Sequence, residues 1–392
     1  MPAFDGVRVL ELGQIYNGPY CGLLFAQLGA DVIKVEPPGG EQLRFRAHQP
    51  IESHEFVMLN SNKRSVVLDL KTDAGRQALL DLVATADVLI ENFAPGTMER
   101  LQLGPARLLE HNPRLIVASG KGYGSTGPYA HMSAMDITVQ AMSGSAAATG
   151  QPDGPPTKGG AAFVDFSGGI HLFGAISAAL FQRERTGRGQ IVEVSMHDTI
   201  YPMLASSLGA LHNDPTRQLP ERTGNRHSGM ALAPYNIYPA SDGWLAIICI
   251  SERHWRGVAT ALGRPELIDD PRFRTEKDRV VNIDAVDEEV SSHTRTRTRA
   301  DLVRDLQAAG VPCAPVKSIR EVDTDEHLIQ RGMIRYVEHP ARGRVPVPGS
   351  PLRLSDSPVG PLRAAQTLGQ STQEVLAELR PDREEPQHVL HA

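Results

Sequence analysis

The sequence is poor in cysteine, in aromatic residues and in long apolar runs, and these scarcities exclude several classes of protein. Its 392 residues include only three cysteines, Cys21, Cys249 and Cys313, whose odd number and wide spacing give neither a disulfide framework nor a metal site. No apolar run approaches the ~20 residues that span a membrane, and the N-terminus lacks a signal-peptide pattern. We therefore expect a cytoplasmic protein with reduced thiols and no contact with a membrane.

A large excess of charge of either sign is also absent. The formal net charge is −6, from 40 lysines and arginines against 46 aspartates and glutamates. This weakly acidic balance argues against a nucleic-acid partner, although it permits a local basic pocket for an anion. The histidines show no zinc-binding spacing, and no Gly-x-Ser-x-Gly elbow occurs, so metal-dependent and serine hydrolases are disfavoured.

Segments of strand and helix length alternate along the first 120 residues. The pattern predicts helices at 19–30 and 74–86, and strands at 6–13, 31–38, 65–70, 87–93 and 113–120. Strand–helix–strand units of this length imply a parallel sheet. The expected fold class is therefore α/β with an open, nucleotide-type sheet. Two longer helices are expected after it, at 168–184 and 195–211.

The length of the chain is enough for more than one hydrophobic core. We expect a large α/β domain that begins with residues 1–212, and a polar linker at 213–222. A smaller α+β domain should follow at 223–329, with two strands around the turn "ASDG" and helices within 279–310. The C-terminal segment, 330–392, should return to the large domain.

One glycine-rich stretch, "GYGSTG" at 122–127, matches the G-x-G-x-x-G pattern of dinucleotide-binding proteins. That fingerprint also needs a helix that opens at the third glycine and an acidic residue roughly 20 positions later. Here Pro128 and a polar loop follow instead. A nicotinamide-dependent dehydrogenase is therefore disfavoured.

Polar side chains stand at the ends of two predicted strands. Asn92 precedes the turn of "ENFAPGTMER", and Lys121 and Tyr123 lie in "GKGYGSTG". Ligands bind at the carboxyl edge of open parallel sheets, and helix N-termini there favour anions. For Asn92, a ligand contact and a hydrogen bond within the protein are equally open. For Lys121 and Tyr123, the surrounding glycines favour a site, since they let the backbone approach a ligand closely.

Asp165 interrupts an apolar stretch, "GGAAFVDFSGGIHLFGAISAALF", with a glycine pair on each side of it. An unpaired ionised carboxylate is costly to bury, so this aspartate requires an explanation. It could cap the helix that follows. It could also be a nucleophile that forms a covalent acyl intermediate, with the glycines leaving space for a bulky group. The stretch alone does not distinguish the two.

Taken together, the motifs resemble those of the class III coenzyme A transferases, the group that includes formyl-CoA and carnitine CoA transferases. The resemblance covers nearly the whole chain, through "FDGVRVLELG", "NKRSVVLDLK", "ADVLIENFAPGTMERLQLG", "GYGSTGPY", "AALFQRERTGRGQIVEVSMHD", "PYNIYPASDGW" and "GVPCAPV". It implies a homodimer of two interlocked chains, and acyl-CoA and carboxylic acids as substrates. It implies no metal and no redox cofactor.

The resemblance also implies roles for individual residues. Asp165 matches the catalytic carboxylate, which forms a mixed anhydride with the acyl group and then a thioester with CoA. Residues that match contacts to CoA are Gln14, Ile15, Asn17, Leu68, Lys71, Asn92, Phe93, Arg100, Lys121, Gly122, Tyr123 and Met196. For Lys71, the residues alone favour a simpler interpretation, in which the lysines and the arginine of 63–71 form a solvated surface.

Departures from the family pattern bear on the substrate. Tyr16 replaces the glutamine of formyl-CoA transferases, and 223–238 lacks their run of glycines, which disfavours formyl and oxalate. Arg44 or Arg46 stands near the position of the acyl group, and guanidinium binds carboxylate in a bidentate manner. We therefore expect Tyr16 and one of these arginines to contact a dicarboxylic acyl group. Succinyl-CoA is the expected donor, and itaconate, mesaconate or glutarate the expected acceptor.

Two other functions are compatible with this resemblance. A 2-methylacyl-CoA racemase of the same family uses a histidine and the aspartate as two bases, but Ala134-Met135-Asp136 stands where the racemase has Gly-His-Asp. A non-catalytic CoA-binding protein is the second alternative, and the presence of Asp165 argues against it.

Overall fold

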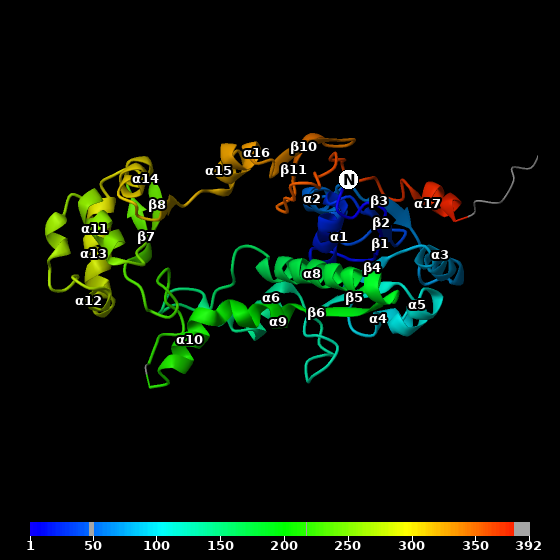
Figure 1. Ribbon diagram of the computed structural model, residues 1–392, viewed down its shortest axis with the longest axis horizontal. Helices are drawn as coiled ribbons and strands as arrows, with labels where there is room; N and C mark the ends of the chain where they lie inside the picture. Colours follow the sequence, from blue (N-terminus) through cyan, green and yellow to red (C-terminus); the bar gives the residue numbers. More distant parts are fainter. Residues whose placement is uncertain (47–50, 217, 380–392) are drawn as a thin grey trace, which may run out of the picture. The chain divides into compact units, whose positions relative to one another are not determined.

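The computed structural model describes residues 1–46, 51–216 and 218–379, and its elements are labelled in Figure 1. The chain forms two compact units. Unit 1 consists of Met1–Val139, Ala161–Ile200 and the segment from Glu326, and unit 2 of Gln140–Gly160 and Tyr201–Asp325. These limits differ from the expected ones mainly at 140–160 and 201–212, which belong to unit 2.

Unit 1 is built around a six-stranded, fully parallel sheet in the order β3-β2-β1-β4-β5-β6. The strands are β1 Arg8–Glu11, β2 Asp31–Glu36, β3 Arg64–Val67, β4 Val88–Glu91, β5 Ile116–Lys121 and β6 Gln190–Ser195. The predicted α/β class is confirmed, and β6 is a strand that the sequence analysis did not predict. From β1 the chain adds β2 and β3 on one side of the sheet, and then adds β4, β5 and β6 on the other side. In open parallel sheets, ligands bind beyond the carboxyl ends of the two strands that meet at this reversal point, here β1 and β4.

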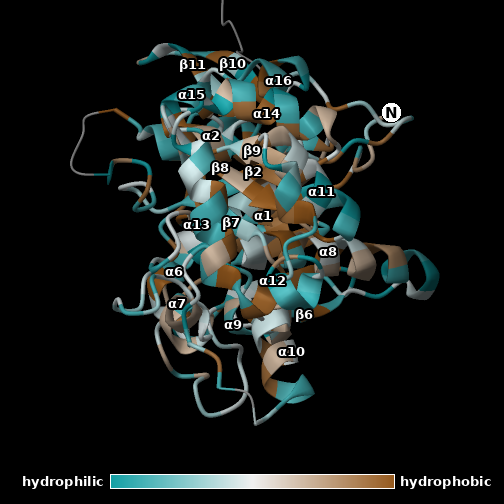
Figure 2. Ribbon diagram, turned by 90° about the vertical axis from the view of Figure 1, so that its left-hand side faces the viewer, coloured by the Kyte–Doolittle hydropathy of each residue, from teal (hydrophilic) through white to brown (hydrophobic). Residues whose placement is uncertain are grey.

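Helices cover both faces of this sheet. On one face, α1 Asn17–Gln27 and α8 Phe163–Thr186 pack Phe25, Leu172 and Ile176 against strand residues such as Val9. Nearly every residue of α1 is buried, and Figure 2 shows the helix in apolar colours. On the other face, α3 Asp73–Val83 and α5 Pro105–His111 cover strand residues such as Leu10. Successive strand residues therefore serve opposite cores.

Two predicted helices differ from those observed. The first, α8, begins at Phe163 and not at 168, so Asp165 lies within its first turn. The second, expected at 195–211, is broken into α9 Met196–Ile200, a 3-10 turn Tyr201–Leu204 and α10 Ala205–Asn213. By length and composition alone α8 could cross a membrane, but core helices of soluble proteins pass the same test, and Leu172 and Ile176 of α8 are fully buried.

The remaining elements of unit 1 complete its edges. A hairpin of β10 Ile334–His339 and β11 Gly343–Pro348 packs on α2 His54–Asn60. Near the end of the described chain, α17 Thr372–Glu378 buries Val375 beside β3. The short helices are α4 Thr97–Arg100, α6 Asp136–Met142, whose last residues belong to unit 2, and α16 Glu326–Gln330.

Unit 2 is a smaller α+β body with an antiparallel sheet of β7 Tyr235–Ala240, β8 Gly243–Ile248 and β9 Cys313–Pro315. Trp255 and Phe273 lie in its core. Its helices are α7 Ser145–Ala148, α10, α11 Glu252–Ala261, α12 Glu276–Val281, α13 Ile283–Thr294, α14 Arg299–Ala308 and α15 Ile319–Asp323, with a 3-10 turn Pro265–Ile268.

A cluster of buried charges lies beneath the carboxyl end of β1. The Glu11 carboxylate receives Lys34 Nζ at 3.0 Å and Lys63 Nζ at 2.5 Å, and all three side chains are almost completely buried. Burial lowers the pKa of Lys63 to about 8, against the opposite effect of Glu11. Next to this cluster, Arg44 binds Glu36 at 2.6 Å. Buried charges of this kind persist only when each has its partner.

Replacing Lys63 by methionine should strongly destabilise the protein, because Glu11 would keep only one cationic partner inside the core. We expect the free energy of unfolding to fall by about 3–5 kcal/mol in urea titrations at pH 7. Arg304→Met, which removes exposed ion pairs with Asp301 and Asp305, is the control and should leave the midpoint unchanged. A small, equal effect of the two substitutions would contradict this account of the buried cluster.

Candidate active site

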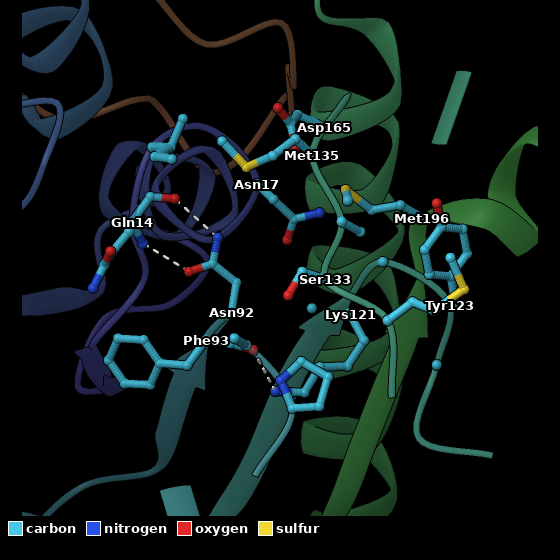
Figure 3. Close-up of a pocket in the computed structure, with 18 of the residues that line it drawn as sticks. Gln14, Asn17, Asn92, Phe93, Lys121, Tyr123, Ser133, Met135, Asp165 and Met196 are labelled. Atoms are coloured by element: carbon cyan, nitrogen blue, oxygen red, sulfur yellow. Dashed lines mark hydrogen bonds between the residues drawn. The ribbon is translucent and has the colours of Figure 1, made fainter. Parts of the chain in front are cut away.

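A cavity of about 350 Å³ opens at the carboxyl edge of the sheet, where β1, β4 and β5 end (Figure 3). Its wall is formed by loops that follow these strands, by residues 130–135, by Asp165 of α8 and by Met196 of α9. Ten residues singled out in the sequence come together here: Gln14, Ile15, Asn17, Asn92, Phe93, Lys121, Gly122, Tyr123, Asp165 and Met196.

The other predicted residues lie outside this cavity. Leu68 and Lys71 line a neighbouring apolar cavity of about 250 Å³, which shares Gln14 and Phe93 with the first. Arg100 is in α4, where its guanidinium donates to Thr97 Oγ1 at 2.7 Å. The two cavities are therefore adjacent, and Arg100 lines neither.

Tyr16, Arg44 and Arg46, which were expected to contact an acyl group, differ in their surroundings. Arg44 is 1% exposed and its guanidinium binds Glu36 and Glu52, so it belongs to the protein interior. Arg46 has an exposed side chain that donates to Tyr16 Oη and Glu55 Oε1, both at 3.4 Å. The Tyr16 ring stacks on Phe166, the neighbour of Asp165, at 5.7 Å between centroids. Of the two arginines, only Arg46 presents its guanidinium to solvent.

Asp136 performs the capping role that the sequence left open for Asp165. Its Oδ2 accepts the backbone N–H groups of Val164 at 3.1 Å and Asp165 at 3.3 Å, two amides of the first turn of α8. Free amides at a helix N-terminus are satisfied by side chains of this type. Asp165 itself is the third residue of the helix and does not cap it. Its side chain is therefore available to the cavity.

The carboxyl group of Asp165 is hard to ionise. Burial raises its pKa to about 7, and the nearby negative charge of Asp136 adds to the shift. Lys121, the one cation among the described residues that line the cavity, binds Glu91 Oε1 at 2.7 Å and donates to the carbonyl of Phe93 at 3.1 Å. The site thus holds a poorly solvated carboxylate that no cation of the described cavity wall neutralises, a property common in catalytic carboxyl groups.

Side chains from β2 and from the segments that follow β2 and β4 hold the loop after β1 at three successive residues. Lys34 Nζ donates to the carbonyl of Gly13 at 2.9 Å. Asn92 bonds both the N–H of Gln14, at 2.7 Å, and its carbonyl, at 2.9 Å (dashed in Figure 3). The N–H of Ile15 donates to Glu41 Oε2 at 3.3 Å, and Ile15 has a φ of 63°. A left-handed conformation is strained for a β-branched residue, so these contacts fix the loop in a particular shape.

The sequence did not indicate that Asp136 contacts the start of α8, or that the partner of Asn92 is Gln14. The spacing of 29 residues between Asp136 and Asp165 gives no sign that they meet. The glycine pair at 168 and 169 was also misinterpreted, because it makes room for α1 and not for a ligand. A Cβ at Gly168 would lie 2.2 Å from Asn17 Nδ2, and one at Gly169 would lie 2.7 Å from the Asn17 carbonyl oxygen.

Replacing Asp136 by asparagine should lower the pKa of Asp165. Asparagine keeps an oxygen that accepts the amides of Val164 and Asp165, but it removes the negative charge that disfavours ionisation. Carbon-13 NMR titration of the side-chain carboxyl groups should show a midpoint near pH 7 for Asp165 in the unaltered protein, and a lower one in the variant. An unchanged midpoint would mean that Asp136 does not act on Asp165 through its charge.

Comparisons with known proteins agree with this geometry. The model of CoA-transferase family III matches residues 4–372. A formyl-CoA:oxalate CoA-transferase of Streptomyces coelicolor is 35% identical over 387 residues, which cover 95% of this chain and 94% of that protein. A succinyl-CoA:mesaconate CoA-transferase of Haloarcula hispanica is 36% identical over 389 residues, 96% of each chain.

The fold comparison gives the same family. The crystal structure of a CaiB/BaiF family protein from Brucella suis superposes with a TM-score of 0.85 at 34% identity, and the match covers 96% of this chain and 99% of that one. The resemblance recognised in the sequence is thereby confirmed. The chain belongs to CoA-transferase family III and is a CoA-transferase.

Proposed function

We propose that the protein moves CoA from an acyl-CoA to a short carboxylic acid through covalent intermediates on Asp165. The observation that carries the proposal is the placement of Asp165, a poorly solvated carboxylate with a pKa of about 7, in the cavity at the reversal point of the sheet. A carboxylate that is poorly solvated and unpaired is a better nucleophile than one in water.

The reaction is a series of carbonyl substitutions. The Asp165 carboxylate attacks the thioester carbonyl, the C–S bond breaks, and a mixed anhydride and CoA thiolate result. The thiolate then attacks the aspartyl carbonyl and expels the donor acid as its carboxylate, which leaves an aspartyl-CoA thioester. The acceptor carboxylate reverses these two steps and leaves as a new acyl-CoA. One negative charge passes between oxygen and sulfur throughout, so no step needs a proton donor or acceptor.

The neighbouring cavity provides a place for the rest of the CoA molecule. Leu68 and Phe93 give it apolar walls, and Lys71 adds a cation at its edge. This combination suits the adenine and phosphate groups of CoA, since flat rings favour apolar walls and phosphates favour cations. The pantetheine arm would then run past Gln14 towards Asp165. Lys121 of β5 binds Glu91 of β4 and the carbonyl of Phe93, and these two contacts hold the ends of the two strands together.

The racemase alternative receives no support from the site. Ala134 and Met135 line the cavity, so the position of the racemase's second base carries no side chain that can move a proton. The formation of an interlocked homodimer and a cytoplasmic location stay predictions.

Replacing Asp165 by alanine should abolish CoA exchange, because no intermediate can form. We expect the rate of acyl-CoA formation to fall by more than about 10³-fold in a mass-spectrometric assay. Asp165→Asn, which keeps the shape, should be equally inactive. It should also be more stable than the unaltered protein at pH 8, since a carboxyl group with a raised pKa destabilises the folded state once it ionises. Exchange that survives in both variants would disprove covalent catalysis by Asp165.

For the substrates, we propose succinyl-CoA as donor and a short dicarboxylate, such as itaconate, mesaconate or glutarate, as acceptor. The two named relatives act on oxalate and on mesaconate at nearly the same identity, so identity does not choose between these acids. Support for the dicarboxylate comes from Arg46, whose exposed guanidinium is linked through Tyr16 to Phe166 beside Asp165. A distal carboxylate can replace Glu55 as the partner of this guanidinium.

Replacing Arg46 by glutamine should therefore affect acids according to their second carboxylate. We expect the KM for dicarboxylate acceptors to rise about tenfold or more, which corresponds to the loss of one charged hydrogen-bond pair. The KM for a monocarboxylate such as acetate is the internal control and should not change. Equal changes for both kinds of acid, or none for either, would remove Arg46 from the substrate site.

A further inference from the structure

Asn17 is held in an unusual way at the first residue of α1. Its side chain is inserted between the backbones of β5 and α8, at two points where only glycine leaves room for it. A Cβ at Gly120 would lie 2.2 Å from Asn17 Oδ1, and one at Gly168 would lie 2.2 Å from Asn17 Nδ2. The place and plane of this carboxamide are therefore fixed by the packing around it.

Despite this close packing, the carboxamide makes no hydrogen bond within the described part of the chain. Asn17 is 3% exposed, and neither Nδ2 nor Oδ1 has a partner. Leaving a buried polar group unsatisfied costs about 1–3 kcal/mol, so an amide held in this state needs an explanation. Asn60 shows the usual arrangement: its Nδ2 donates to Phe56 O and its Oδ1 accepts Lys63 Nζ.

The amide of Asn17 lies at the same cavity as Asp165, the proposed nucleophile. Figure 3 shows the Asn17 carboxamide in the region between Asp165, Met196 and Lys121. Asn17 Nδ2 lies against Gly168, which is three residues after Asp165 in α8. Residues with this spacing are neighbours on one face of a helix, about 5–6 Å apart. Asn17 Nδ2 and the Asp165 side chain therefore meet the same cavity within about one turn of α8.

We propose that Asn17 Nδ2 donates a hydrogen bond to the carbonyl oxygen that becomes negative when a bond to Asp165 forms or breaks. The inference rests on the proposed covalent function and names the group that stabilises its transition states. Each substitution on the pathway passes through an oxyanion, and a donor that is already oriented stabilises it at no cost of reorganisation. The amide remains unpaired in the free protein because its partner arrives with the substrate.

The test compares Asn17→Ala with Asn17→Asp, and uses Asn60→Ala as a matched control for the loss of a buried amide. Exchange between succinyl-CoA and a carboxylic acid is followed by mass spectrometry, and stability by urea unfolding. We expect Asn17→Ala to lower kcat by about 10²–10³-fold with little change in KM. Its stability should stay close to that of the unaltered protein, because no hydrogen bond is lost. Asn60→Ala should be clearly destabilised.

Asn17→Asp fills the same space but places an oxygen where the donor was, so its kcat should fall at least as far as that of the alanine variant. A kcat within threefold of the unaltered protein in either Asn17 variant would overturn the inference. So would a loss of stability in Asn17→Ala as large as that in Asn60→Ala, since it would mark a structural role. If the unaltered protein itself showed no exchange, the proposed function would fail, a result distinct from either of these.

Discussion

The buried charges beneath the carboxyl end of β1 are the constraint on which the site depends. Lys34 connects the two regions, because the same ammonium binds Glu11 in the core and the carbonyl of Gly13 in the loop. Glu41 extends the cluster to the N–H of Ile15. Without these contacts, the strained loop at Ile15 would relax to another conformation. Buried ion pairs add little net stability, so we explain these charges by the loop conformation that they maintain. That shape delivers Asn17 to the cavity.

The surroundings of Asp165 offer little that would stabilise its negative charge. α8 brings the carboxylate to the cavity, Asp136 satisfies the helix amides that would otherwise stabilise its charge, and Lys121 is held by Glu91. Burial, together with the negative charge of Asp136, raises the pKa of this carboxyl group to about 7. A group of this kind loses little solvation when it attacks a carbonyl, whereas an aspartate paired with a lysine would be stable and unreactive.

The sequence predicted the parallel sheet, and it marked Asp165 as a carboxylate within an apolar stretch, because periodicity, strand ends and composition are local signals. It could not predict which partner each polar group finds. For Asn92 a ligand contact and a hydrogen bond within the protein were equally open, and the structure shows its hydrogen bonds to Gln14. Arg44 or Arg46 was expected at the substrate, and Arg44 binds Glu36 within the protein. The unpaired carboxamide of Asn17 has no signature in the sequence either, since it depends on glycines about 100 and 150 positions away.

Covalent catalysis by Asp165 is tested most directly by detecting the bond between Asp165 and CoA. The protein would be mixed with succinyl-CoA, quenched in acid and digested, and the peptide that contains Asp165 analysed by mass spectrometry. If Asp165 carries CoA, this peptide should gain the mass of CoA less one water, at Asp165 and only when an acyl-CoA is supplied. A peptide that stays unmodified while the solution accumulates new acyl-CoA would contradict it.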